Sequence, residues 1–398
     1  MSNTLQTRHG LIVPLLALVT LGLMLALITR PSGCAGSERF VVRLSGSGGS
    51  GGLGGASSSS SSSSAGAAGA GAGAGRKCES STVYESSEYE STWLKNAAAW
   101  SKDFCKHADT PEQNELMEKW LNGIASANKK PAEAPAGLDP SVFSKFVTTV
   151  KCDDGTSSEH TDWIEPLAHG LRHPYNFCSQ NKFAPSEVYT DRVVAVIYNR
   201  TYLLLANRQG VDSVRGARGD CERRECQVFF FDLGATAYRQ SDKEPGQSWF
   251  VRSYAAAGLP FDRMFEWEAR AMSPAEIFNE VPKELLKVYS YFNIPATTDT
   301  KDPSHAVNIL KSLAKPGDFV VFKLDIDAAA VEIPILKALT EDPEAVKLVD
   351  EFFFEHHVNF PPMRPYWGGT LDEGIGLAES MQLFLEIRKK GVRAHSWV

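Results

Sequence analysis

The C-terminal half of the chain contains a series of short apolar runs that alternate with helical patterns. The apolar runs span 193–198, 202–206, 228–231, 264–265, 319–324, 351–354 and 391–397. Apolar residues recur at helical spacing over 249–257, 275–292, 331–339 and 377–390. Fully apolar strands separated by helices indicate a sheet that is buried on both faces, which is typical of an α/β fold. The first two runs are too close for a crossover helix, so they predict an antiparallel hairpin.

Residues 76–190 precede this alternation and contain several cysteines. Apolar side chains there recur at helical spacing, as in Trp93, Ala97 and Trp100. Six cysteines lie between residues 78 and 226, an even number that favours disulfides, and no CxxC pair is present to favour a zinc site. The sequence therefore predicts a helical, disulfide-pinned cap over 76–190, followed by a second domain over 191–398.

An uncharged apolar segment lies near the N-terminus, at 11–29, and is mostly Leu, Val, Ile, Ala and Met. A helix of this length spans about 28 Å, close to the thickness of a bilayer's hydrocarbon core. A cleaved signal peptide is the alternative, but its apolar run is shorter, about 7–15 residues. We therefore expect an uncleaved signal anchor that crosses the membrane at 11–29, with a cytoplasmic tail at 1–10.

Residues 30–75 form a stalk in this interpretation. From 45 to 75 the chain consists of Gly, Ser and Ala, apart from Leu53. Such a tract has nothing to bury, so it predicts a disordered linker. Anchor, stalk and disulfides together are typical of a single-pass type II membrane protein of the Golgi or endoplasmic reticulum, with its folded part in the lumen. The sequon Asn199-Arg200-Thr201 would be open to glycosylation there.

The charge of the chain argues against one class of partner. With 41 Lys plus Arg against 48 Asp plus Glu, the formal net charge is −7. Proteins that bind nucleic acids neutralise phosphates with basic surfaces, which an acidic chain does not favour. We therefore expect no nucleic-acid partner.

The most informative stretch is Cys226-Gln-Val-Phe-Phe-Phe-Asp232-Leu-Gly234-Ala-Thr-Ala-Tyr238. It predicts a buried strand that ends in an acid, followed by a tight turn that needs Gly234. In an open α/β sheet, a ligand docks beyond the carboxyl ends of the strands. This turn lacks GxGxxG, and Asp232 would repel a phosphate, so a dinucleotide is disfavoured. The acid suits a ligand with hydroxyls or an ammonium group, and S-adenosylmethionine has both.

This stretch resembles the first motif of class I S-adenosylmethionine-dependent methyltransferases, and among them the FkbM-like group. Residues 261–269 are similar to the family's second strand, 318–327 with the following Glu332 to its fourth, and 349–357 to its fifth. The resemblance implies a Rossmann-like sheet, mostly parallel with an antiparallel last strand. It also implies S-adenosyl-L-methionine as cofactor, with Glu266 on the ribose hydroxyls and Glu268 as the alternative. The cofactor-binding residues that it implies are Asp232, Gly234, Ala235, Glu266 and Asp325.

Acids and histidines follow the two strands that resemble the family's fourth and fifth. They are Asp325, Asp327, Glu355, His356 and His357. We expect His357 to be the catalytic base, because imidazole titrates near neutral pH, with His356 and Asp327 as further catalytic candidates. A histidine that merely satisfies a neighbouring acid is the alternative. A second functional interpretation is a divalent metal ion bound by Asp325, Asp327, Glu355 and His357, since each i,i+2 pair shares a strand face.

These features together predict an S-adenosylmethionine-dependent O-methyltransferase of the secretory pathway. The expected acceptor is a sugar hydroxyl on a glycan or glycoconjugate, or a small molecule; this substrate class follows from the compartment and from family analogy. Thr236 and Tyr238 stand where the family's cofactor loop usually holds glycines. The alternative is therefore a non-catalytic, methyltransferase-like binding or assembly module anchored in the membrane.

Overall fold

The structure is a computed structural model that describes residues 77–171, 199–218, 226–239, 246–363, 367 and 370–397. All of them belong to one structural unit, Gly71–Val398. Among these residues, no helix is both long and apolar enough to cross a membrane. The predicted anchor at 11–29, the stalk at 30–75 and the apolar run at 193–198 lie outside the described residues.

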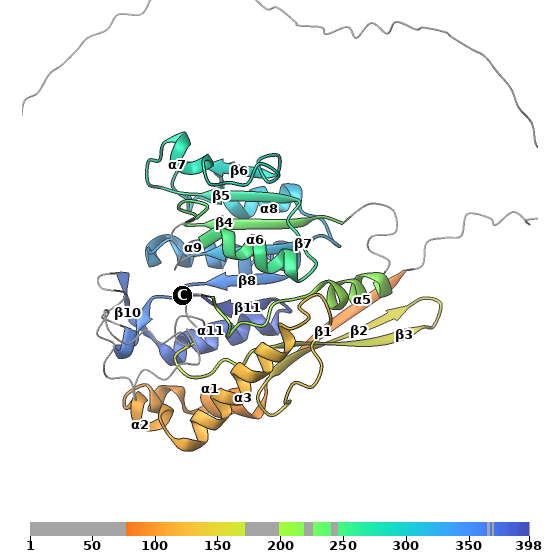
Figure 1. The fold of residues 1–398 in the computed structure, drawn as a ribbon, viewed down its shortest axis with the longest axis vertical. Helices are drawn as coiled ribbons and strands as arrows, with labels where there is room; N and C mark the ends of the chain where they lie inside the picture. Colours follow the sequence, from red (N-terminus) through yellow and green to blue (C-terminus); the bar gives the residue numbers. More distant parts are fainter. Residues whose placement is uncertain are drawn as a thin grey trace, which may run out of the picture. The chain divides into compact units, whose positions relative to one another are not determined.

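A six-stranded sheet forms the centre of the fold (Figure 1). Its strands are β4 (Val228–Leu233), β5 (Arg263–Trp267), β6 (Tyr289–Phe292), β7 (Phe319–Leu324), β8 (Glu351–Phe354) and β11 (Arg393–Ser396). They are hydrogen-bonded in the order β11-β8-β7-β4-β5-β6, and each neighbouring pair is parallel. This order is the one found in doubly wound α/β folds. The predicted α/β fold with a mostly parallel sheet is confirmed.

The last strand differs from the prediction, because β11 runs parallel to β8 rather than antiparallel. The helix α11 (Leu377–Lys389) lies between the two strands in the chain and carries it back along the sheet. A chain that returns through a crossover helix enters the sheet in the same direction as its neighbour. The expected antiparallel strand was therefore wrong.

Helices cover both faces of this sheet and join its strands. Those that lie between its strands in the chain include α6 (Gly246–Ala256), α7 (Pro274–Phe278), α8 (Ala306–Leu313), α9 (Ala329–Thr340) and the 3-10 helices η1 (Val346–Leu348) and η2 (Pro361–Met363). The helix α5 (Arg208–Arg218) precedes β4 and packs against the cap instead. A short parallel pair, β9 (Val358–Asn359) and β10 (Asp372–Gly376), precedes α11. Every residue of β4, β7 and β8 is buried, as the apolar runs require.

Two local predictions were wrong. The helix expected over 275–292 is limited to α7, which ends at Phe278, and β6 begins at Tyr289. Pro282 lies between them, and a proline cannot donate the main-chain hydrogen bond that a continuing helix needs. The hairpin predicted over 193–206 is also wrong, because its second run, 202–206, is largely buried but forms no strand.

Buried carboxylates, rather than a neighbouring strand, accept main-chain hydrogen bonds from residues 202–206. The Leu204 amide donates to Glu165 Oε2 at 3.0 Å, and the Ala206 amide donates to Glu351 Oε1 at 2.8 Å. Buried main-chain donors need an acceptor, and a carboxylate is a strong one. This segment therefore links the cap to the central sheet.

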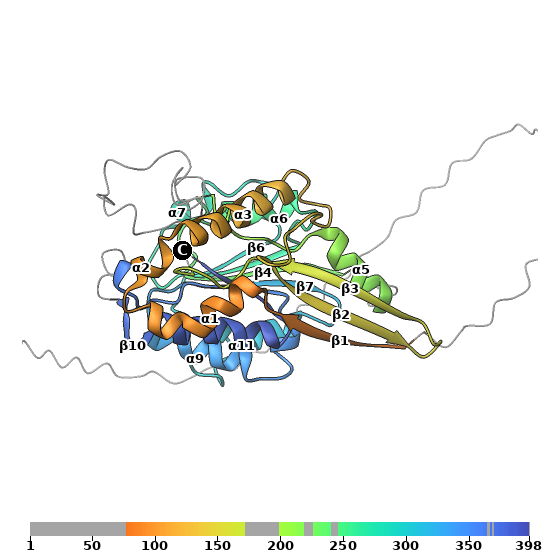
Figure 2. The same ribbon diagram turned by 90° about the horizontal axis from the view of Figure 1, so that it is seen from below.

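The cap combines the predicted helices with strands that were not predicted. Its helices are α1 (Glu88–Trp100), α2 (Phe104–Ala108) and α3 (Pro111–Ala127), and its antiparallel sheet contains β1 (Cys78–Glu85), β2 (Ser144–Cys152) and β3 (Ser157–Ile164). These strands lie side by side next to α5 (Figure 2). A disulfide joins Cys78 and Cys152, which are register partners in β1 and β2. Cys105 and Cys226 each belong to a further disulfide. The predicted disulfide pinning is confirmed, whereas an all-helical cap is not.

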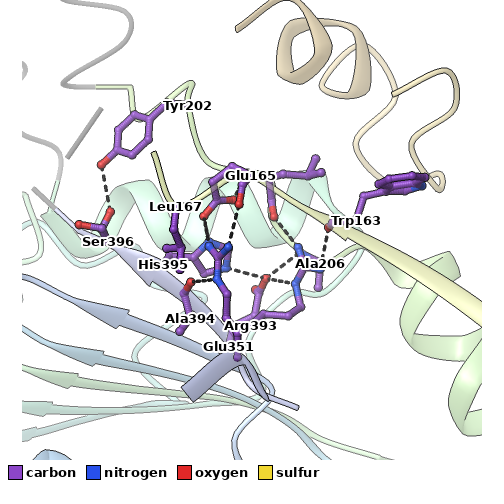
Figure 3. A network of polar contacts seen from close by, with 12 residues as sticks. Trp163, Glu165, Leu167, Tyr202, Ala206, Glu351, Arg393, Ala394, His395 and Ser396 are labelled. Atoms are coloured by element: carbon purple, nitrogen blue, oxygen red, sulfur yellow. Dashed lines mark hydrogen bonds and ion pairs between the residues drawn. The ribbon is translucent and has the colours of Figure 1, made fainter. Parts of the chain in front are cut away.

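A buried ionic network holds the cap against the central sheet (Figure 3). The guanidinium of Arg388, in α11, donates to Glu90 of α1 at 3.1 Å and to Glu165 at 3.2 Å. Arg388 and Glu90 are both fully buried. Buried charges persist when they are paired and hydrogen-bonded, so these residues fix α1 against α11.

The last strand contributes the other half of this network. Arg393 donates to Glu351 at 2.8 Å and to Asp162 of β3 at 2.7 Å. His395 lies between Glu165, 2.8 Å from its Nδ1, and Glu351, 3.2 Å from its Nε2. Burial lowers the pKa of His395, but the two carboxylates outweigh burial and raise it above the ordinary value. The C-terminal strand is therefore locked both to its neighbour β8 and to the cap.

Candidate functional site

A cavity of about 500 Å³ opens at the carboxyl ends of β4, β5 and β7. The strand order reverses between β4 and β7, and a doubly wound sheet binds its ligands at such a switch point. Side chains from several strand ends line the cavity, among them Asp232, Glu268, Lys323, Asp325, Asp327 and Glu355. Most of the acids that the sequence indicated therefore face one common space, whereas Glu266 does not line it.

The turn after β4 is shaped by Gly234. Its φ is +92°, a left-handed value that glycine adopts freely. A Cβ at this position would collide with the main-chain oxygen of Asp325. The amides of Gly234 and Ala235 both donate to the Trp267 carbonyl, at 3.0 and 2.9 Å. The turn thus lies between the ends of β5 and β7, and Gly234 and Ala235 line the cavity.

Tyr238 does not fill the cavity. Its ring is buried and packs against the ring of Tyr289, with 6.5 Å between the centroids, and it is not part of the cavity wall. Thr236, by contrast, lines the cavity in a left-handed conformation with φ at 47°, and its amide donates to Glu268 Oε2 at 3.1 Å. The two residues that replace glycines thus leave the cavity open.

Lys323 lines the cavity and is a residue that the sequence reasoning did not single out. Its ammonium lies 2.8 Å from Asp232 and 3.1 Å from Asp325, and all three groups line the cavity. Burial lowers the pKa of Lys323, but the two acids outweigh this and raise it, so the lysine is charged. Burial likewise raises the pKa of Asp325, yet Lys323 holds it below its ordinary value. A lone charged residue in the apolar run 319–324 was the signal that a buried partner exists.

Glu266 lies behind this group rather than on the cavity. It is the register partner of Asp232, so both side chains project from the same face of the sheet. Glu266 is fully buried, and neither carboxyl oxygen meets a hydrogen-bond donor among the described residues. Burial first, and then the nearby Asp232 charge, raise the pKa of Glu266 well above its usual range, so it is a neutral acid.

The alternative acid, Glu268, reaches the cavity instead. It follows the last residue of β5, is partly exposed, and accepts hydrogen bonds from the amides of Thr236 at 3.1 Å and Arg270 at 2.6 Å. Glu266 lies inside β5 and does not line the cavity. The alternative that the sequence offered, Glu268, lines it.

Asp327, Glu355 and His357 form a tight cluster beside the cavity, which we call the acid–histidine cluster. His357 Nε2 lies 3.4 Å from Asp327 and 3.3 Å from Glu355, and the three potential ligand atoms lie within 4.8 Å of one another. Asp325 is not part of it, because its carboxylate pairs with Lys323 and accepts a hydrogen bond from Trp397 at 3.1 Å. Three of the four predicted metal ligands thus converge.

His356 was expected beside the catalytic groups and is not there. It is buried, its Nδ1 lies 2.9 Å from the Ser380 hydroxyl in α11, and its ring stacks on Phe354. Successive residues of an extended chain point in opposite directions, so His356 faces α11 when His357 faces the acids. The prediction for His356 is therefore wrong, and it does not line the cavity.

Glu332 supports the cavity wall from behind, and Arg200 and Trp397 are part of the wall. Glu332, buried in α9, accepts a hydrogen bond from the amide of Ile326, which lines the cavity, at 2.8 Å, and burial raises the pKa of Glu332 to about 7. This contact holds the turn that carries Asp325 and Asp327. The Arg200 guanidinium stacks on the ring of Trp397 at 3.9 Å.

The structure is that of an α/β protein with an acid-rich cavity at the switch point of its sheet. A comparison of the chain with protein-family models, with curated proteins and with solved structures found no match. The methyltransferase resemblance thus depends on the sequence motifs of this chain alone.

Proposed function

We propose that this protein is an S-adenosylmethionine-dependent O-methyltransferase. The observation that carries the proposal is an open cavity at the switch point of a parallel sheet, with acids from four strand ends on its wall. Its volume, about 500 Å³, lies within the range of cofactor and small-molecule sites. The acids suit a cationic ligand with a cis-diol better than they suit a phosphate.

Glu268 is the residue that we assign to the ribose hydroxyls. It is partly exposed on the cavity wall, and two main-chain amides orient its carboxylate. A carboxylate that accepts both protons of a cis-diol makes charge-assisted hydrogen bonds. Gly234 and Ala235 let the backbone approach the ligand, and Asp232 and Asp325 supply negative charge, half offset by Lys323. The two acids and the lysine ammonium fit the amino-acid part of the cofactor, which carries an ammonium and a carboxylate.

The acid–histidine cluster faces the acceptor side in this proposal. When bound, S-adenosylmethionine supplies an electrophilic methyl group for an acceptor oxygen. A hydroxyl acceptor must lose its proton, and Asp327, Glu355 and His357 form the group that takes it. The side chain of Asp327 is 67% exposed, so an acceptor can reach it from solvent.

The acceptor class that we propose is a sugar hydroxyl on a glycan or glycoconjugate. It rests on the proposed placement of the folded part in the lumen of the Golgi or endoplasmic reticulum, anchored through 11–29. The disulfide between Cys78 and Cys152 supports an oxidising compartment. The sequon residue Asn199 is exposed, which agrees with that placement.

A non-catalytic binding module is the second candidate. The observation that favours it is Thr236, which takes a left-handed conformation at the cavity although a β-branched residue disfavours it. Such a module would bind the cofactor or a glycan without turnover. Release of labelled methyl groups onto a glycan acceptor separates the two candidates.

The test compares Glu268→Gln with Glu280→Gln, an exposed control away from the cavity. Loss of the charge-assisted bonds, about 1.5–3 kcal/mol, predicts roughly 10- to 100-fold weaker S-adenosylmethionine binding for Glu268→Gln and no change for the control. Isothermal titration calorimetry measures the affinity, and transfer of a labelled methyl group measures activity. If Glu268→Gln binds as tightly as the control, the cofactor is not held where we propose.

A further inference from the structure

His395 lies between two buried carboxylates that belong to different parts of the fold (Figure 3). Its Nδ1 is 2.8 Å from Oε1 of Glu165, the residue that follows β3 of the cap. Its Nε2 is 3.2 Å from Oε1 of Glu351, in β8 of the central sheet. The ring is fully buried and stacks on Phe353, with 4.6 Å between the centroids. Close packing therefore holds both ring nitrogens against a carboxylate oxygen.

Glu165 is an ionised carboxylate. In addition to its contact with His395, it accepts hydrogen bonds from the Leu204 amide at 3.0 Å and from the Arg388 guanidinium at 3.2 Å. A buried carboxylate that accepts several hydrogen bonds keeps its charge. Burial raises the pKa of Glu165, but His395 and Arg388 outweigh burial and lower it below the ordinary value.

Glu351 is ionised for the same reason. The Ala206 amide and Arg393 Nε donate to it, each at 2.8 Å, and the Tyr254 hydroxyl is a third donor. Burial raises the pKa of Glu351, but the hydrogen bond with His395 and the charge of Arg393 outweigh burial and lower it. Both neighbours of the imidazole are therefore negatively charged acceptors.

These contacts require a hydrogen on each ring nitrogen of His395. A neutral imidazole has one N–H and one lone pair, and that lone pair would face an ionised oxygen at 2.8 or 3.2 Å. Such repulsion is strong in a buried site, where water does not screen it. When both nitrogens are protonated, the ring donates to Glu165 and to Glu351, and its positive charge lies between their negative charges.

Charged and titratable groups from the neighbouring elements surround this bridge. Among the described residues, the acids of the network are Glu90, Asp162, Glu165 and Glu351, the bases are Arg388, Arg393 and His395, and the hydroxyl donors are Tyr84 and Tyr254. The arginines keep their charge, so His395 is the base of this network that can lose its charge near neutral pH. Loss of that proton leaves two ionised acids on either side of a neutral ring.

The same contacts support part of the cavity wall. The segment 199–207 supplies Arg200 to this wall, and Trp397, which directly follows β11, stacks on the Arg200 guanidinium. The amides of Leu204 and Ala206 attach the segment to the two carboxylates that His395 bridges. Whatever holds this bridge together therefore also holds Arg200 and Trp397 at the cavity.

We propose that protonated His395, with Glu165 and Glu351, is a clamp that holds the cap and the segment 199–207 against the central sheet and releases them as the pH rises. This inference goes beyond the proposed function and does not depend on it. The pKa of His395 is raised in the folded protein, so the clamp contributes fully below the unfolded pKa of about 6.5. Its contribution is lost as the pH rises through the folded pKa.

Nitrogen-15 NMR of the unmodified full chain tests the protonation state. His395-Ser396 is the one His-Ser pair in the sequence, so paired labels on histidine and serine assign its signals. We expect N–H groups on both ring nitrogens at about pH 6.5 and a titration midpoint above that value. A ring with a single N–H at this pH, or a midpoint below it, would overturn the clamp.

Hydrogen exchange at about pH 6 and about pH 9, corrected for intrinsic exchange rates, tests the release. Linkage to one proton changes an opening equilibrium by up to about tenfold per pH unit between the two pKa values. We expect the protection of the Leu204 and Ala206 amides to fall at least about tenfold more than that of Val320 and Val321 in β7. An equal change in both segments, or no change, contradicts the proposal.

His395→Gln is the key variant, because glutamine donates hydrogen bonds but carries no charge. The protection of 199–207 should then no longer depend on pH, whereas His160→Gln, which replaces a partly exposed histidine of β3, should behave as the parent. The parent's pH dependence in His395→Gln would assign the release to another group and reject the clamp. If this variant does not fold, the NMR titration of the unmodified chain decides.

Discussion

Replacement of Lys323 by Met tests whether its ammonium stabilises the acids of the cavity. Met preserves the length of the side chain and removes the charge that lies 2.8 Å from Asp232 and 3.1 Å from Asp325. Removing one partner of a buried ion pair costs about 3–5 kcal/mol, because an uncompensated charge stays buried. We expect Lys323→Met to lower the free energy of unfolding by about this amount near neutral pH.

The loss should depend on pH in a defined direction. Without Lys323, burial raises the pKa of Asp232 and Asp325 above the unfolded value of about 3.9. When the pKa of a carboxyl is higher in the folded than in the unfolded protein, the free energy of unfolding falls once the pH exceeds the unfolded pKa. It continues to fall until the pH has passed the folded pKa. Lys323→Met should therefore be closer to the parent protein at about pH 5 than at about pH 8.

Urea unfolding followed by tryptophan fluorescence measures both effects. Lys347→Met, an exposed lysine in η1, is the control and should change stability by less than about 0.5 kcal/mol. A loss in Lys323→Met that is no larger than in the control, or that is the same at both pH values, would refute the buried ion pair.

Three further variants test the local arguments. Gly234→Ala should lower the free energy of urea unfolding by at least about 1–2 kcal/mol, because of its left-handed φ and the collision with Asp325. The same variant should weaken S-adenosylmethionine binding, and unchanged binding would contradict the proposed role of the turn. Cys78→Ser with Cys152→Ser opens a 74-residue separation and should cost about 2–4 kcal/mol; a stability equal to the parent's would contradict this. Glu266→Gln should flatten the fall in stability that its raised pKa imposes above about pH 4.3. An unaltered pH profile would show that the pKa of Glu266 is not raised in the folded protein.

The strands that position the site could be predicted because their sequences leave few alternatives. The run 351–354 coincides with β8 and 319–324 coincides with β7, since a fully apolar segment between helices must be buried on both faces. The cap strands were missed although β2 alternates buried and partly exposed residues along its length. There the period of two was a usable signal.

The sequence indicated which kinds of side chain line the cavity, but not which of two neighbouring candidates faces it. Asp232 and Gly234 follow from one motif, whereas the choice between Glu266 and Glu268 depends on where β5 ends. The two share a strand face, so periodicity cannot separate them. His356 and His357 are likewise adjacent, and the side that each faces depends on the path of the chain after β8.

Calorimetric titration of the unmodified full chain with S-adenosylmethionine and, separately, with ATP tests the central claim most directly. Both ligands carry adenosine, but the first is a cation without phosphate and the second a polyphosphate. We predict saturable binding of S-adenosylmethionine at one site, with a dissociation constant of about 1–100 μM, and no measurable heat with ATP. Binding of ATP without binding of S-adenosylmethionine would contradict the account.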